Sequence, residues 1–152
     1  MKNFADLTER EVLAVAISSE EEDSRIYMSF AEDLAERYPD SAKVFEEMAE
    51  EENVHRRRLI EAHRAAVGEH IPLIRRQDVK GFIAKQPLWL MPQLNLAEVR
   101  KYAETMEFEA ERFYRRAADT TRDASTRQLL LELAEIESRH EDTAQKLGEE
   151  IL

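Results

Sequence analysis

Charged side chains inside apolar helical stripes are the feature that most constrains how this 152-residue chain folds. Around EENVHRRRL, residues 51–59, apolar residues recur at alternating steps of three and four, which is typical of the buried face of an amphipathic helix. Glu52 and His55 fall on that same stripe. Because an unpartnered buried charge is strongly destabilising, a core face with a carboxylate and an imidazole must supply partners for both.

Four segments of the chain show helical periodicity, and residues that start or stop helices separate them. Thr8–Glu11 and Asn95–Glu98 have the spacing of capping boxes, which begin helices. Pro39 blocks continuation of the first helix, and Gly68 is expected to follow the second. The predicted helices span about residues 9–37, 41–67, 96–120 and, from a cap at Asp123 or Ser125, to about residue 148.

The predicted connections are short within two pairs of helices and long between the pairs. Short connections make each pair an antiparallel hairpin, while residues 69–94, which contain three of the four prolines, form a long crossover. We therefore predict an all-α fold, an antiparallel four-helix bundle that forms a single domain over residues 1–152. We expect PLWLM (87–91) in the crossover to pack on the bundle, with a dimer contact or a membrane-facing patch as alternatives.

The composition excludes several classes of function. With 22 basic and 33 acidic residues the formal charge is −11, which argues against non-specific nucleic-acid binding. The absence of cysteine excludes disulfides, thiolate metal sites and cysteine nucleophiles. No apolar run approaches the ~20 residues of a membrane span, and the N-terminus MKNFADLTER lacks the apolar segment of a signal peptide. We therefore expect a soluble, cytoplasmic protein.

An internal repeat relates the two predicted hairpins. EEMAEEENVH (46–55) aligns without a gap with LELAEIESRH (131–140), and EEEDSRIY (20–27) aligns with EFEAERFY (107–114). The alignment pairs Glu with Glu, His with His and Tyr with Tyr at the positions of interest. One unit therefore occurs twice, which predicts a bundle with approximate twofold symmetry.

Each predicted helix carries one glutamate in its apolar stripe, and two of these glutamates are followed three residues later by histidine. The six residues are Glu20, Glu52, His55, Glu107, Glu137 and His140. Residues three apart share a helix face, so each Glu-x-x-His pair can converge on one point.

Four buried carboxylates need neutralisation, and no stripe contains an arginine at this level. Two divalent cations would supply four positive charges, and a donor set of carboxylate oxygen and imidazole nitrogen suits iron, manganese or zinc. One glutamate from each of two helices, with Glu-x-x-His from the other two, is the ligand pattern of di-iron carboxylate bundles. We therefore predict a site for two metal ions.

Several other polar residues fit this pattern less well. Glu104 lies one turn before Glu107 and breaks the repeat, because its counterpart is Ile17; it is either a solvated residue or an extra carboxylate ligand. Tyr27 and Tyr114 are expected in the core, where they can also hydrogen-bond to ligands. We expect Glu21–Asp23 and Arg56–Arg58 to lie at the surface. His63 and His70 are isolated histidines that belong to no Glu-x-x-His motif.

At Glu20, Glu52–His55, Glu104–Glu107 and Glu137–His140 the sequence resembles the rubrerythrin branch of the ferritin-like superfamily over almost the whole chain. A doubled glutamate on the third helix is typical of rubrerythrins, where one of the pair is a redox-dependent ligand, and this implies a ligand role for Glu104. The stretch IPLIRRQDVKGF with PLWLM is similar to the N-terminal erythrin domain of bacterial membrane-bound ferritins. In that family the domain precedes a membrane domain similar to vacuolar iron transporters.

The resemblance implies a non-haem di-iron protein that oxidises Fe(II) with peroxide or dioxygen, in iron homeostasis and peroxide defence. Glu52 and Glu137 would bridge the two irons, and the histidines would complete their ligand spheres. The terminal carboxylates would be Glu20, Glu104 and Glu107. A homodimer is expected from ferritin-like precedent and from the apolar crossover, and zinc or manganese can substitute for iron.

Two departures from the resembled families leave alternatives open. The chain has no cysteine-rich rubredoxin domain to deliver electrons, so a peroxidase cycle would need Fe(II) itself or an external donor. It also has no membrane domain, so we expect either a fragment of a longer protein, tethered to the inner membrane, or a stand-alone relative. The alternative functions are an iron-binding module that delivers iron to a membrane transporter, and a structural acidic bundle without metal.

Overall fold

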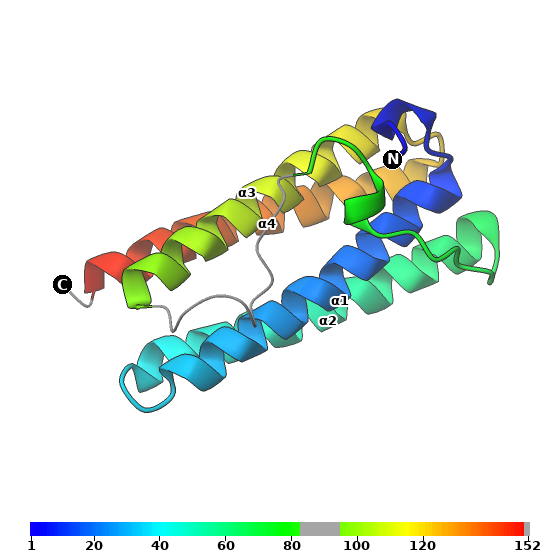
Figure 1. The fold of residues 1–152 in the computed structure, drawn as a ribbon. Helices are drawn as coiled ribbons and strands as arrows, with labels where there is room; N and C mark the ends of the chain where they lie inside the picture. Colours follow the sequence, from blue (N-terminus) through cyan, green and yellow to red (C-terminus); the bar gives the residue numbers. More distant parts are fainter. Residues whose placement is uncertain (83–94, 151–152) are drawn as a thin grey trace.

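The computed structural model describes residues 1–82 and 95–150, and its description of side chains ends at residue 140. Within these residues the chain forms four α-helices and no strand, which confirms the predicted all-α, ferritin-like four-helix bundle (Figure 1). The α-helices are α1 (Glu9–Leu34), α2 (Pro39–Val67), α3 (Leu96–Thr120) and α4 (Ala124–Glu150), and the 3-10 turns are η1 (Phe4–Asp6) and η2 (Arg76–Asp78).

The four α-helices form two hairpins that lie side by side. Helix α1 packs along α2, and α3 packs along α4, while fewer contacts join α1 to α3 and α2 to α4. The crossover leaves α2, and its η2 turn contacts α1. The predicted PLWLM cluster lies outside the described residues. The described helices include none that is long and apolar enough to cross a membrane.

Side-chain caps fix the beginnings of three helices. The Thr8 hydroxyl accepts a hydrogen bond from Glu11 N, and the Glu11 carboxylate accepts one from Thr8 N, so the predicted capping box is present. At the start of α3 the structure shows one half of the predicted capping box, in which Asn95 Oδ1 accepts a hydrogen bond from Glu98 N at 2.9 Å. Asp123, and not Ser125, caps α4 by accepting a hydrogen bond from the backbone N–H of Thr126, the third residue of the helix.

Three predicted helix ends were wrong by a few residues. Helix α1 ends at Leu34 instead of residue 37, and α2 begins at Pro39 instead of residue 41. Proline suits the first position of a helix, because its missing N–H has no partner there in any case. Helix α4 continues through Gly148 to Glu150. Gly68 ends α2 as predicted, with a positive φ of 99° that strongly favours glycine.

The apolar core lies in two clusters on either side of one polar level. On α1 the buried apolar residues occupy 12–17 and 26–34, and Glu20 lies between them. The buried apolar residues of α3 are divided in the same way by Glu107. The apolar clusters therefore hold the helices together above and below the level at which the predicted ligands meet.

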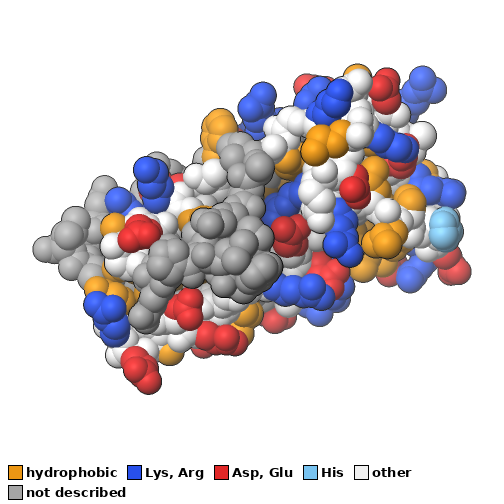
Figure 2. Space-filling view, in the orientation of Figure 1, with side chains coloured by type: hydrophobic (Ala, Val, Ile, Leu, Met, Phe, Trp, Pro, Cys, Tyr) orange, Lys and Arg blue, Asp and Glu red, His pale blue; other side chains and the backbone are white. Residues whose placement is uncertain are grey.

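The outer surface mixes charges of both signs. On the face drawn in Figure 2, Lys and Arg side chains lie among Asp and Glu side chains over the described helices. Three ion pairs illustrate this mixing, namely Arg25 with Glu21, Arg57 with Glu50 and Arg58 with Glu132. The predicted solvated role of the arginines that follow His55 is thus correct for Arg57 and Arg58.

A buried ion pair ties the crossover to α1, and the sequence did not predict it. The Arg76 guanidinium of η2 lies 2.7 Å from Asp23 Oδ1 and 3.2 Å from Glu22 Oε1. Asp23 is buried, so its predicted surface position was wrong. Helix periodicity placed Asp23 one turn from Glu20, but it gave no information on where the crossover would lie.

We predict that Arg76→Ala destabilises the metal-free protein by about 3 kcal/mol, because Asp23 loses its buried cationic partner. Urea unfolding followed by circular dichroism measures the change. The matched control is Arg75→Ala, an exposed neighbour that we expect to change stability by less than about 0.5 kcal/mol. Equal stability of the two variants would contradict a stabilising role for the ion pair.

Candidate metal centre

Six ionisable side chains from all four α-helices converge between the two hairpins. Helix α1 supplies Glu20 and α3 supplies Glu107, while α2 and α4 each supply a glutamate and the histidine three residues later. All six are at most 7% exposed. The residues are Glu20, Glu52, His55, Glu107, Glu137 and His140. Four carboxylates and two imidazoles therefore meet at the level between the two apolar clusters.

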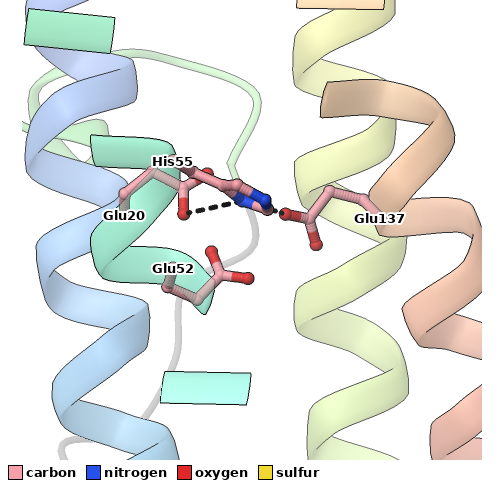
Figure 3. Close-up of side chains that lie close together, drawn as sticks. All are labelled: Glu20, Glu52, His55 and Glu137. Atoms are coloured by element: carbon pink, nitrogen blue, oxygen red, sulfur yellow. Dashed lines mark ion pairs between the residues drawn. The ribbon is translucent and has the colours of Figure 1, made fainter. Parts of the chain in front are cut away.

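The first group of possible ligand atoms comes from Glu20, Glu52, His55 and Glu137, and all of these atoms lie within 4.8 Å of one another. Figure 3 shows the His55 ring pointing between Glu20 and Glu137, with the Glu52 carboxylate beside it. His55 Nδ1 lies 3.8 Å from Glu20 Oε2 and 3.6 Å from Glu137 Oε1. These distances are too long for hydrogen bonds, so His55 Nδ1 has no hydrogen-bond partner among the described residues.

The second group comes from Glu52, Glu107, Glu137 and His140, again within 4.8 Å of one another. His140 Nδ1 lies 3.2 Å from Glu107 Oε2, 3.5 Å from Glu137 Oε2 and 3.7 Å from Glu52 Oε1. Glu52 and Glu137 belong to both groups. The two groups therefore share a pair of carboxylates, one from each Glu-x-x-His motif.

Both groups leave buried polar atoms without hydrogen-bond partners among the described residues. These atoms are both carboxylate oxygens of Glu52, Oε2 of Glu20, Oε1 of Glu137 and Nδ1 of His55. Such atoms are costly in a protein interior unless something binds them. A cation with bonds of about 2.1 Å holds opposite ligand atoms ~4.2 Å apart, so the donor set fits metal ions after small side-chain adjustments.

Two tyrosines link the hairpins through the carboxylates of the site. Tyr27 of α1 donates a hydrogen bond to Glu107 of α3, and Tyr114 of α3 donates one to Glu20 of α1. Burial and the neighbouring Glu20 raise the pKa of Tyr114 well above its usual value, which keeps its hydroxyl proton in place as a donor. Both tyrosines are also core residues, as the sequence predicted.

The family model Rubrerythrin matches residues 11–148 of this chain. The chain belongs to the rubrerythrin family. A solved structure titled "Hypothetical Protein Pfu-1136390-001 From Pyrococcus furiosus" is 21% identical, with a TM-score of 0.76, and the match covers 96% of this chain and 91% of that one. It supports the fold alone. No curated protein matched the chain. The narrower resemblance to the erythrin domain of membrane-bound ferritins stays a prediction.

In this rubrerythrin-family chain the pKa values of three buried carboxylates shift in opposite directions when no metal is bound. Burial, with the nearby charges of Glu137 and Glu20, raises the pKa of Glu52 well above its usual value. Burial and Glu137 likewise raise the pKa of Glu107. Burial alone would also raise the pKa of Glu137, but the neighbouring Glu107, His140 and His55 lower it strongly. Protons thus provide part of the neutralisation that cations would provide.

The two histidines hold protons more tightly than an isolated imidazole does. Burial alone would lower the pKa of His55, but Glu137 and Glu20 raise it to about 9. Burial also acts against His140, whose pKa Glu107, Glu137 and Glu51 raise to about 12. A metal ion must displace these protons to bind Nδ1, so metal binding should release protons to solution.

Three further residues complete the comparison with the sequence. Glu104 is half-buried one turn before Glu107 and belongs to neither ligand group, so its ligand role stays a prediction. The sequence did not predict the role of Glu51, whose Oε2 lies 2.7 Å from His140 Nε2. Glu51 lies beside Glu52 on the exposed edge of its helix, and no residue pattern marks it as a partner of a histidine. His63 is buried, with Nδ1 2.6 Å from Gly68 O, and serves the end of α2 instead of a ligand site.

We predict that the metal-free protein loses stability as the pH rises from about 6.5 to about 9. A histidine whose pKa is raised on folding stabilises the fold fully below its unfolded pKa, and this contribution is lost as the pH passes the folded pKa. Thermal unfolding of the metal-free protein across this range measures the effect. The stability difference between wild type and His55→Asn should shrink as the pH rises, and a constant difference would contradict the prediction.

Proposed function

We propose that this rubrerythrin-family protein binds two iron ions between its hairpins and oxidises Fe(II) with hydrogen peroxide or dioxygen. The observation that carries the proposal is the pair of overlapping ligand groups, each with three carboxylates and one imidazole Nδ1, which share Glu52 and Glu137. Membership of the rubrerythrin family supports iron as the metal, with zinc and manganese as substitutes that the same donor atoms accept.

Glu52 and Glu137 would contribute to both metal positions, because they are the members common to both groups. Glu20 and His55 would complete the first position. The second position would be completed by Glu107 and His140. Glu104, half-buried one turn before Glu107, would be an additional carboxylate ligand that depends on the oxidation state of the bound metal. The four glutamates of the two groups supply four negative charges against the four positive charges of two Fe(II) ions.

When bound, two Fe(II) ions give one electron each, so that one hydrogen peroxide and two protons become two water molecules, or one dioxygen and two protons become one hydrogen peroxide. The chain itself would supply buried carboxylates in a fixed geometry. Tyr27 and Tyr114 hold the outer carboxylates, Glu107 and Glu20, in place through their hydroxyl groups. The chain contains no cysteine, so electrons for repeated turnover would come from Fe(II) or an external donor.

We also propose that the protein acts in the cytoplasm as a homodimer, in iron homeostasis and peroxide defence. A membrane iron-transport domain, in the same protein or as a partner, is the proposed recipient if the site delivers iron instead of oxidising it repeatedly. Two irons per chain without rapid oxidation, with iron transfer that depends on a partner, would favour this delivery function over the oxidase.

We predict that Glu52→Ala and His140→Ala abolish Fe(II) oxidation while leaving the helical circular-dichroism signal intact. Glu52 belongs to both ligand groups and His140 to the second, so each variant removes a ligand from the site. The assay adds peroxide or air to anaerobic protein loaded with Fe(II), follows near-ultraviolet absorbance, and counts metal per chain by elemental analysis.

The matched controls are exposed residues of the same types, Glu50→Ala on α2 and His70→Ala after it. Both controls should retain the wild-type iron content and the wild-type rate of oxidation. Full activity in Glu52→Ala and His140→Ala would refute the assignment of the site. A wild-type chain that binds no metal would refute the proposed function altogether.

A further inference from the structure

The internal repeat relates the two metal positions, but the surroundings of the two histidines differ. His140 directs Nδ1 toward the carboxylates of Glu107, Glu137 and Glu52, and its other nitrogen, Nε2, lies 2.7 Å from Glu51 Oε2. Glu51 belongs to neither ligand group. The imidazole of His140 is therefore held from both sides, by the site on one side and by a carboxylate of α2 on the other.

The repeat gives His55 no such carboxylate. In the gap-free alignment of residues 46–55 with 131–140, the counterpart of Glu51 is Ile136. Ile136 is half-buried and packs against the apolar cluster that also contains Leu133. An isoleucine side chain can neither accept a hydrogen bond from an imidazole nor add charge to it. The ion pairs of His55, at 3.6 and 3.8 Å, are made through Nδ1, the atom that faces the site.

A carboxylate on the outer nitrogen of a ligating imidazole has three effects. It fixes the ring orientation, it keeps the proton on Nε2 so that Nδ1 offers its lone pair, and it makes the imidazole a stronger donor. The Glu51 side chain is 45% exposed, so it acts from the rim and does not occupy the space between the hairpins.

We propose that Glu51 is a positioning residue for His140, and that it makes the metal position of Glu107 and His140 bind its ion more tightly than the position of Glu20 and His55. This inference rests on the proposed function only in that two metal ions bind the two ligand groups. It adds that the pseudo-symmetric site fills in order, with the His140 position first.

The test is an anaerobic titration of the metal-free protein with Co(II), followed by calorimetry and visible absorbance. The wild-type protein should bind two ions in two resolved steps. Glu51→Ala should weaken the tighter step by about 10–100-fold and leave the other nearly unchanged. Glu51→Gln keeps an acceptor oxygen for Nε2–H, so the affinity of its tighter step should lie between those of the wild type and Glu51→Ala. Glu50→Ala, an exposed neighbour paired with Arg57, should match the wild type.

A double-mutant cycle separates positioning from a merely structural role. If Glu51 acts through His140, Glu51→Ala should have no further effect on Co(II) affinity in a His140→Ala background. A similar loss in both backgrounds, or an unchanged tighter step in Glu51→Ala, would overturn the inference while leaving the proposed function intact. Two equal steps in the wild type would also overturn it. A wild type that binds no Co(II) and does not oxidise Fe(II) would overturn both.

Discussion

The mutual repulsion of carboxylates buried between two hairpins is the constraint on which the rest of this structure depends. Apolar clusters above and below the polar level bring the helices together, and they bury four carboxylates at one level, those of Glu20, Glu52, Glu107 and Glu137. Carboxylates buried this close together are stable only when protons or metal ions balance their negative charge. Without metal, the raised pKa values of the two histidines and of Glu52 and Glu107 favour bound protons, so the protons held by these groups contribute to stability.

This constraint also explains why the outer contacts are polar. The tyrosine hydroxyl groups and Glu51 approach the ligands from outside the ligand groups, where they can fix carboxylates and an imidazole without competing for the inner atoms. Both carboxylate oxygens of Glu52 have no hydrogen-bond partner among the described residues, as expected for atoms that bind a cation. A protein selected only for stability would replace such groups by apolar side chains of similar volume.

The sequence predicted the fold and the convergence of six polar residues because both follow from local periodicity. A helix of 3.6 residues per turn assigns each residue to a face, and the repeat places the two halves of the site at matching levels. The interactions that it missed depend on geometry between segments. Arg76 lies on Asp23 only because the crossover passes over α1, and Glu51 contacts His140 only because of the ring orientation. Neither fact is encoded in the spacing of residues along one helix.

The exchange of ligands between the hairpins has a consequence for how the protein assembles. Each group takes three residues from one hairpin and one from the other, with Glu137 completing the first and Glu52 the second. Because α1 packs on α2 and α3 on α4 through residues close in the chain, each hairpin can form early in folding. Neither hairpin alone contains a complete group. The ligand groups are therefore completed only when the two hairpins pack together. Bound metal would then slow the separation of the hairpins.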